Sequence, residues 1–340
     1  MRKLLFLLSM TVSIATFSQA MAMDEIYDNG GLPSTEIYLG AFNNLEKFSK
    51  KEPQTNIVNS KNSAVDASGK TATLKNNDKI QSPVKPTNDT SQEFKPTDDT
   101  SKQFKPTGFV EAGGNYSHLT NDFNSWSGGY VKGEVQTDPN NRWNAEILHE
   151  REFGDDGNYG AIGNTHNFNE NWYSSVNIGA ADRGFFLPRY RIDAFLNRKW
   201  LENKSLITTI GFGEYKARDT YRDESLFFGL TYYFPKRWIL QGGIRYNNST
   251  PGNIDSFSEF VAVTEGEYKK HFLTLRYGFG KESYQIIGPS NSISDFKSDI
   301  ISLELRQWVY KNWGFNAKGE YYHNPNYNRT GINLGVFYEF

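Results

Sequence analysis

Charged side chains that alternate with apolar ones in the second half of the sequence are the residues best placed to do chemistry. Glu304 and Arg306, for example, interleave with leucines. Such a row can line a wet passage for polar solutes or a glycan chain, or it can pair across neighbouring strands and rigidify a closed interior. Acids and bases are mixed, so no selectivity for one sign of ion is predicted. The candidates for a lumen lining are Arg191, Asp193, Arg245, Arg276, Glu304, Arg306, Lys318 and Glu320.

Motifs for catalysis or metal binding are missing from the sequence. The five histidines have no close metal-ligand spacing, and there is neither a Gly-x-Ser-x-Gly elbow nor a Gly-x4-Gly-Lys phosphate loop. The chain has no cysteine, which removes thiolate metal sites and cysteine nucleophiles. We therefore expect no enzyme, no catalytic residue, no metal and no cofactor. A lipid-acting enzyme stays open as a third alternative, and it would need a serine beside His149 or His323 on a lipid-facing strand.

The segments that must position these residues are strands. From residue 108 to residue 340, apolar residues recur with a period of two, and turn residues interrupt them at intervals of about 15 to 18 residues. Short connections such as 138–141 alternate with longer ones such as 248–256 and 284–296. Bacterial outer-membrane barrels combine short periplasmic turns with longer outer loops. The predicted fold is all-β: a transmembrane, antiparallel, up-and-down β-barrel of about 14 strands behind a disordered N-terminal arm.

Aromatic residues beside the short turns favour a membrane barrel over a soluble sandwich. Alternation alone cannot decide, because a sandwich has the same period with the apolar face turned inward. Amphipathic rings at a membrane boundary place an apolar body in lipid and a polar edge in water. The predicted periplasmic girdle is Trp143, Trp172, Trp200, Trp238 and Trp313.

The last strand resembles an assembly signal. Residues 332–340 alternate and end on Tyr338 and Phe340, which resembles the signature that the outer-membrane assembly machinery recognises. We expect that machinery and outer-membrane lipid as partners.

Aromatic residues near the predicted outer loops form a second candidate binding set. Rings on exposed loops can stack on sugars or form a receptor surface. The alternative is that the phenylalanines pack back onto the barrel rim or into its mouth. The set is Tyr159, Phe185, Phe186, Tyr221 and Tyr284.

The N-terminal third of the sequence predicts that the protein is exported and that a spacer precedes the barrel. Residues 1–22 have the basic start, apolar stretch and small cleavage-site residues of a signal peptide. A short periplasmic segment, 23–51, follows, and 52–107 is a disordered linker rich in Pro, Thr, Asp and Lys that contains ten-residue repeats. The barrel is expected at 108–340. Peptidoglycan is a candidate partner of this arm.

Composition excludes two classes of protein. With 37 basic and 39 acidic residues the net charge is −2, so the chain has no overall positive electrostatic field that would attract nucleic acid. Beyond the N-terminus no apolar run approaches the ~18 residues of a membrane-spanning helix.

The span 109–340 resembles the YaiO-type outer-membrane β-barrel family. The likeness rests on Val-Glu-Ala-Gly-Gly-Asn-Tyr-Ser at 110–117, on Asn-Ala-Glu-Ile-Leu-His-Glu-Arg at 144–151 and on Asn-Glu-Asn-Trp at 169–172. The resemblance implies an architecture and a location in the bacterial outer membrane, with the arm in the periplasm. It implies no particular activity or ligand.

The function that these features favour is a small porin-like channel, or a transport-associated barrel of the cell envelope, for polar solutes or glycan. The alternative is a non-conducting barrel that binds at the surface or tethers the envelope. An interior bridged shut by ion pairs, with binding residues on the loops, would distinguish that alternative.

Overall fold

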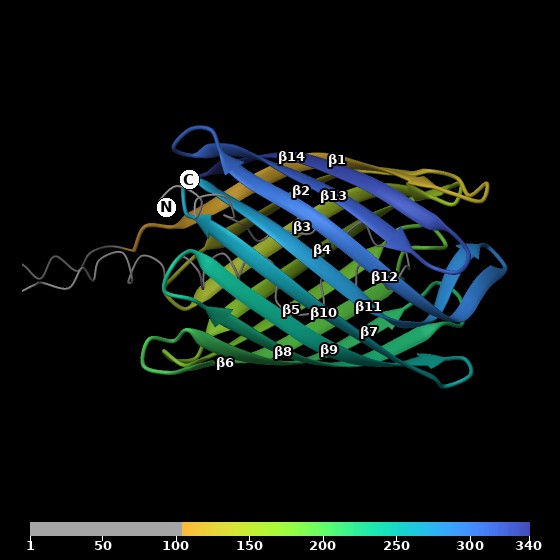
Figure 1. Ribbon diagram of the computed structural model, residues 1–340, viewed down its shortest axis with the longest axis horizontal. Helices are drawn as coiled ribbons and strands as arrows, with labels where there is room; N and C mark the ends of the chain where they lie inside the picture. The colour runs from red at the N-terminus through yellow and green to blue at the C-terminus, as the bar shows by residue number, and fades with distance from the viewer. Residues whose placement is uncertain (1–103) are drawn as a thin grey trace, which may run out of the picture. The chain divides into compact units, whose positions relative to one another are not determined.

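The computed structural model describes residues 104–340, and these form one closed antiparallel β-barrel of fourteen strands (Figure 1). The predicted signal peptide, the segment 23–51 and all but the end of the linker lie outside the described residues. No helix in the described part is long and apolar enough to cross a membrane. The strands are β1 (Thr107–Leu119), β2 (Trp126–Gln136), β3 (Asn141–Glu152), β4 (Asp155–Asn167), β5 (Trp172–Ala181), β6 (Tyr190–Trp200), β7 (Leu206–Lys216), β8 (Arg222–Tyr233), β9 (Trp238–Thr250), β10 (Ile254–Glu267), β11 (His271–Gly288), β12 (Asn291–Trp308), β13 (Trp313–His323) and β14 (Asn328–Glu339).

Each strand pairs with its sequence neighbours, and the ring closes where β1 pairs with β14. That seam is in continuous register from Phe109 opposite Glu339 to Leu119 opposite Arg329. The start of β1 and the end of β14 therefore lie at the same end of the barrel, here called the terminal end; the opposite end is the far end. Fourteen strands about 4.8 Å apart and tilted by about 40° give a backbone circle roughly 28 Å across.

The connections differ from the predicted long loops. The turn within 248–256 is confined to 251–253, and the turn within 284–296 is confined to 289–290. The prediction of long loops there is wrong because backbone pairing continues through these polar stretches and extends the strands. The longest connection at the far end is 182–189, between β5 and β6.

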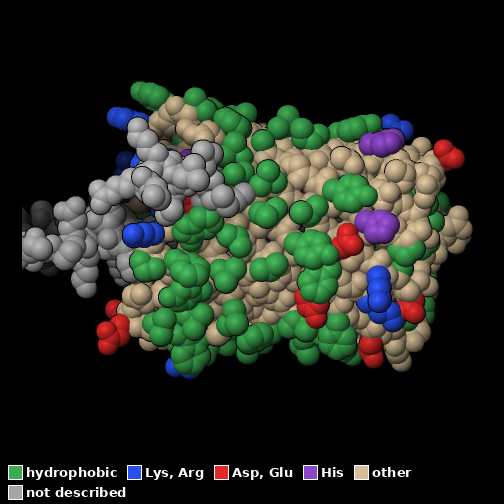
Figure 2. Space-filling view, viewed as in Figure 1, with side chains coloured by type: hydrophobic (Ala, Val, Ile, Leu, Met, Phe, Trp, Pro, Cys, Tyr) green, Lys and Arg blue, Asp and Glu red, His purple; other side chains and the backbone are tan. Residues whose placement is uncertain are grey.

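Side chains are partitioned with apolar groups outward and polar groups inward. On β8 the outward residues Leu226, Phe228 and Leu230 are exposed, whereas the inward Ser225 and Thr231 are buried. Hydrophobic side chains cover much of the wall in Figure 2, and charged side chains lie mainly toward the two ends of that view, with histidines near the right-hand end. Between Leu226 and Phe234 the apolar stripe rises about 20 Å, close to the apolar band of a membrane barrel.

All five tryptophans of the predicted girdle lie on the outward face at the terminal end. Trp143 and Trp313 are exposed, and the other three are half-buried. The Arg198 guanidinium lies 3.6 Å from the ring centre of Trp200 and 5.1 Å from that of Trp172. Their contact with a membrane boundary stays a prediction.

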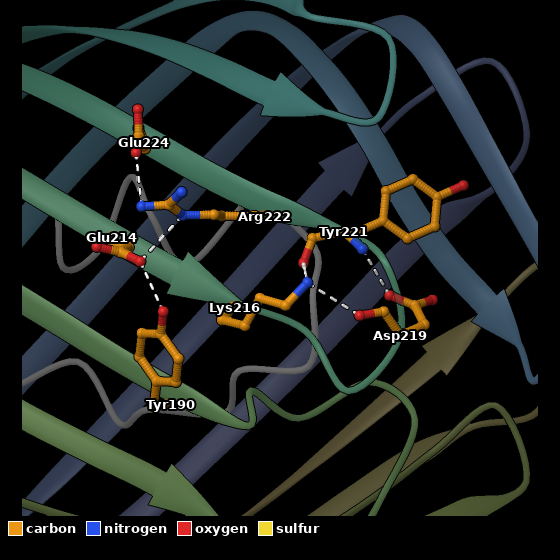
Figure 3. A network of polar contacts seen from close by, with 7 residues as sticks. All are labelled: Tyr190, Glu214, Lys216, Asp219, Tyr221, Arg222 and Glu224. Atoms are coloured by element: carbon orange, nitrogen blue, oxygen red, sulfur yellow. Dashed lines mark hydrogen bonds and ion pairs between the residues drawn. The ribbon is translucent and has the colours of Figure 1, made fainter.

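A polar cluster on the outward face marks the far limit of the apolar band (Figure 3). Glu214 of β7 accepts hydrogen bonds from the Tyr190 hydroxyl at 2.7 Å and from Arg222 Nε at 3.0 Å. Arg222 also pairs with Glu224 at 2.8 Å. Beyond them, Lys216 donates to the backbone oxygen of Tyr221 at 3.2 Å. Charged groups at this height belong in water or among lipid headgroups, so the band ends below them.

Lipid contact of the outward face can be tested at Ile210, which is 62% exposed on β7. Ile210→Arg should lower the free energy of unfolding in lipid vesicles by about 2–4 kcal/mol, because it places a charge at membrane depth. Thr330→Arg, outward near the far end of β14, should cost at most about 1 kcal/mol. Denaturant titration of the vesicle-embedded barrel measures both. Two equal, small losses would show that this wall is not in lipid.

Candidate functional site

The lumen wall carries all eight predicted lumen-lining residues on its inward face. Six of them are buried, and Arg276 and Glu320 are half-buried. They do not form one group. Arg191 pairs with Asp193 on β6, whereas Arg245 donates to the hydroxyl of Ser225 at 2.8 Å.

Glu111 of β1 is the centre of the most buried ion network. Its side chain is 1% exposed and lies 3.1 Å from Arg306 Nη1 and 3.3 Å from Lys132 Nζ. The Tyr130 hydroxyl donates to the same carboxylate at 2.9 Å. Arg306 comes from β12 and Lys132 from β2, so the network crosses the β1–β14 seam. We call these three charged residues the seam clasp.

Aromatic rings surround the guanidinium of Arg306. The ring centre of Phe337 lies 3.6 Å from the Arg306 Cζ, and those of Trp308 and Phe109 lie 5.3 and 5.4 Å away. Rings exclude water from the ion pairs and add a cation–π attraction. The sequence predicted that Arg306 faces inward, but not that it pairs with Glu111, which is 195 positions away.

A second ion network joins β13 and β14. Glu320 lies 3.0 Å from Lys318 Nζ and 2.9 Å from Arg329 Nη2. The Arg329 guanidinium lies 4.5 Å from the ring centre of Trp126. Lys318 and Glu320 are both among the predicted lumen-lining residues, and the structure pairs them.

The outer parts of β11 and β12 form a two-stranded arm that leaves the barrel wall. β10 pairs with β11 only as far as Gly280, and β12 pairs with β13 only from Asp299. Residues 281–298 therefore pair only with each other, and we call them the hairpin arm. Five consecutive residues of this arm, 282–286, are buried, so both faces of the strand are covered.

Polar contacts hold the hairpin arm at the far end of the lumen. The Tyr284 hydroxyl donates to Asp223 of β8 at 3.0 Å, and Gln285 donates to the Tyr327 hydroxyl at 2.6 Å. The Tyr284 ring stacks on Tyr221 with 4.1 Å between centres. These partners come from opposite sides of the arm.

An apolar cluster crosses the lumen beside the arm. Because β4 and β11 lie seven strands apart in a ring of fourteen, a continuous cluster that includes both spans the interior. The β5–β6 loop joins it, and Gly157 permits its close approach, since a Cβ there would lie 2.7 Å from Leu187. We call this cluster and the hairpin arm the cap. The buried members of the cluster are Tyr130, Leu148, Tyr159, Phe186, Leu187, Ala217, Tyr284 and Ile286.

The predicted outer-loop binding set lies within or against this cap. Tyr159 and Tyr284 are on β4 and β11 and are buried, so their prediction as exposed loop residues is wrong. Phe186 is buried as well, while Phe185 and Tyr221 are half-buried against the cluster. The rings turn inward because packing in the apolar cluster removes their surface from water. The alternative of packing into the mouth describes Phe186 correctly.

Among residues 104–340, no group of three or more histidines and acids is arranged to hold a metal ion. His149 and His323 lie outward, each within 3.0 Å of an asparagine side chain.

A family model for the YaiO membrane beta barrel domain matches residues 108–285. The chain belongs to the YaiO membrane β-barrel family. Barrels with an even number of antiparallel strands are typical of the bacterial outer membrane. No curated protein matches the sequence.

Several solved barrels are similar in structure. A loop-deletion form of the outer membrane protein OmpT of Vibrio cholerae is 8% identical, with a TM-score of 0.42, over 69% of this chain and 99% of that one. An anion-selective porin from Comamonas acidovorans is 9% identical, with a TM-score of 0.41, over 69% and 99%. The CymD monoaromatic hydrocarbon channel is 6% identical, with a TM-score of 0.49, over 70% and 89%.

Loss of the carboxylate of the seam clasp should destabilise this YaiO-family barrel. Glu111→Ala leaves Arg306 and Lys132 buried without that acceptor, which should cost about 3 kcal/mol of unfolding free energy. Glu224→Ala removes an acid from the exposed pair with Arg222 and should cost at most about 1 kcal/mol. Denaturant titration of both variants in vesicles checks this. Similar losses for the two would mean that the clasp adds nothing to closure.

Proposed function

We propose that this protein is a channel of the bacterial outer membrane for small polar solutes or glycan, and that the cap closes its mouth in the described conformation. The observation that carries the proposal is the polar lumen wall, with serine, threonine, asparagine and glutamine beside charges of both signs. A wall of this kind can exchange hydrogen bonds with a hydroxyl-rich solute as it passes. Mixed charge favours uncharged or weakly charged solutes over one sign of ion.

A patch of neutral polar side chains lies on β6 to β9, away from the seam clasp. Thr209 donates to Asn197 at 2.6 Å, and Gln241 donates to Thr231 at 3.4 Å. Next to them the rings of Phe227 and Phe260 lie stacked with centres 6.3 Å apart. Hydroxyl and amide groups beside aromatic faces are the groups that sugars bind.

A non-conducting barrel is the second candidate, and the cap favours it. An apolar cluster across the lumen, together with buried ion networks, is what a permanently closed interior would have. Its ligands would then bind outside the barrel.

The far end faces the outside of the cell in this proposal, and both ends of the barrel chain face the periplasm. The uniformly short turns of the terminal end, three to five residues each, support that orientation. The N-terminal arm would then reach the periplasm, where peptidoglycan is its candidate partner. Tyr338 and Phe340, outward at the end of β14, would address the assembly machinery.

If the cap is a gate, Tyr284→Ala should open it. The variant removes the ring stacked on Tyr221 and the hydroxyl bonded to Asp223, together worth about 1–2 kcal/mol, so open probability should rise about tenfold. Tyr277→Ala is the matched control, because Tyr277 lies on the same strand but faces outward and is 41% exposed. Single-channel recording in planar bilayers measures both variants and the wild-type chain. Silence in all three, with folding verified by heat modifiability, would contradict the channel and leave the non-conducting barrel.

Charge in the lumen should influence ion preference if ions pass. Arg276 faces inward, with its guanidinium 3.9 Å from the ring centre of Phe260. Arg276→Ala should move the reversal potential in a KCl gradient toward that of a cation-preferring pore, because one positive charge leaves the wall. Arg198→Ala removes a charge from the outward face and should leave the potential unchanged. An equal shift of the reversal potential in both variants would show that Arg276 does not line the conduction path.

A further inference from the structure

A cleft of about 550 Å³ opens on the outward face where the hairpin arm leaves the wall. β11 and β12 turn away from their neighbours at Gly280 and Asp299, which leaves the wall recessed between β10 and the turn after β13. Phe257 borders the cleft on the β10 side, and Pro325 borders it on the other.

Two lysines face each other at the base of the arm. Lys281 and Lys297 are direct cross-strand partners, an arrangement of like charges that destabilises a sheet when nothing offsets it. Lys281 forms an ion pair with Asp295. Lys297 is exposed and has no hydrogen bond or ion pair within residues 104–340. Its charge is therefore uncompensated.

The remaining lining suits an amphiphile. His323 adds a polar ring, and Asp299, its register partner, is the one acid among the residues that line the cleft. The rings of Phe257 and Phe279 are exposed on the side of the apolar band, and Phe279 stacks on Tyr277 with centres 5.5 Å apart. A cationic upper edge above exposed apolar rings matches a lipid whose headgroup is anionic.

We infer that this cleft binds the phosphate-bearing headgroup of a glycolipid in the surrounding leaflet. The phosphate lies between Lys281 and Lys297 with His323 as a further donor, and an acyl chain follows Phe257 and Phe279 down the wall. Lipid-linked phosphate is the ligand, not free phosphate, because the cleft opens onto the lipid-facing side. The inference uses the orientation proposed above but does not require that the lumen conduct.

The test is a titration of the full-length chain, refolded in detergent, with bisphosphorylated lipid A, followed by native mass spectrometry. Lys281→Gln with Lys297→Gln should weaken binding about tenfold, and Lys297→Gln alone should weaken it several-fold. The control, Lys236→Gln with Lys311→Gln, removes the same charge from turns at the terminal end and should bind as the wild type does. Dephosphorylated lipid A should bind all of these chains equally weakly.

Equal affinity of the wild-type and double-variant chains for lipid A would overturn the inference. Displacement of lipid A by millimolar inorganic phosphate would also overturn it, since the site would then take free phosphate. If the double variant does not fold, the Lys297→Gln variant alone tests the inference, because no hydrogen bond or ion pair within residues 104–340 depends on that side chain. If the barrel shows no conductance but the lysine variants still bind lipid A more weakly than the wild type, the proposed channel is refuted and the lipid site is supported.

Discussion

Closure of the sheet is the constraint on which the rest of this structure depends. Lipid offers no hydrogen bonds, so an open sheet edge at membrane depth would leave a row of backbone groups unsatisfied. The β1–β14 seam removes that edge by joining the first and last strands over eleven register pairs, Phe109–Glu339 to Leu119–Arg329. The seam clasp lies across this junction, where Glu111 draws Arg306 and Lys132 together from both sides. The buried ion pairs therefore lie at the seam that closes the barrel.

Closure also makes the interior a separate environment. Polar residues face inward because lipid rejects them, and they then need partners, which the ion networks supply. At the far end the wall extends beyond the apolar band, as the outward cluster around Glu214 shows. There β11 and β12 extend beyond the ends of β10 and β13, so the hairpin arm can fold over the mouth of the barrel. The cap and the outward cleft are two results of that one departure from the wall.

Period-two alternation was enough to predict fourteen strands and the inward face of Arg191, Arg245 and Lys318. It could not predict the pairing of Arg306 with Glu111, because which strands meet across a seam depends on the closed ring and not on local pattern. The cap was missed for a related reason. Residues 284–296 have the Gly, Pro, Ser and Asn content of a loop. The burial of Tyr284 and Gln285 comes from contacts with Asp223 and Tyr327, which are distant in sequence.

The most direct test of this account is single-cysteine scanning along β8, which the absence of native cysteine makes clean. Cysteine at 226, 228 and 230 should be quenched by a lipid-soluble probe and should resist a charged thiol reagent. Cysteine at 225, 227 and 231 should escape the lipid probe, since those side chains face the lumen. Reaction of the even positions with the charged reagent in intact vesicles would contradict a lipid-embedded barrel with a polar interior.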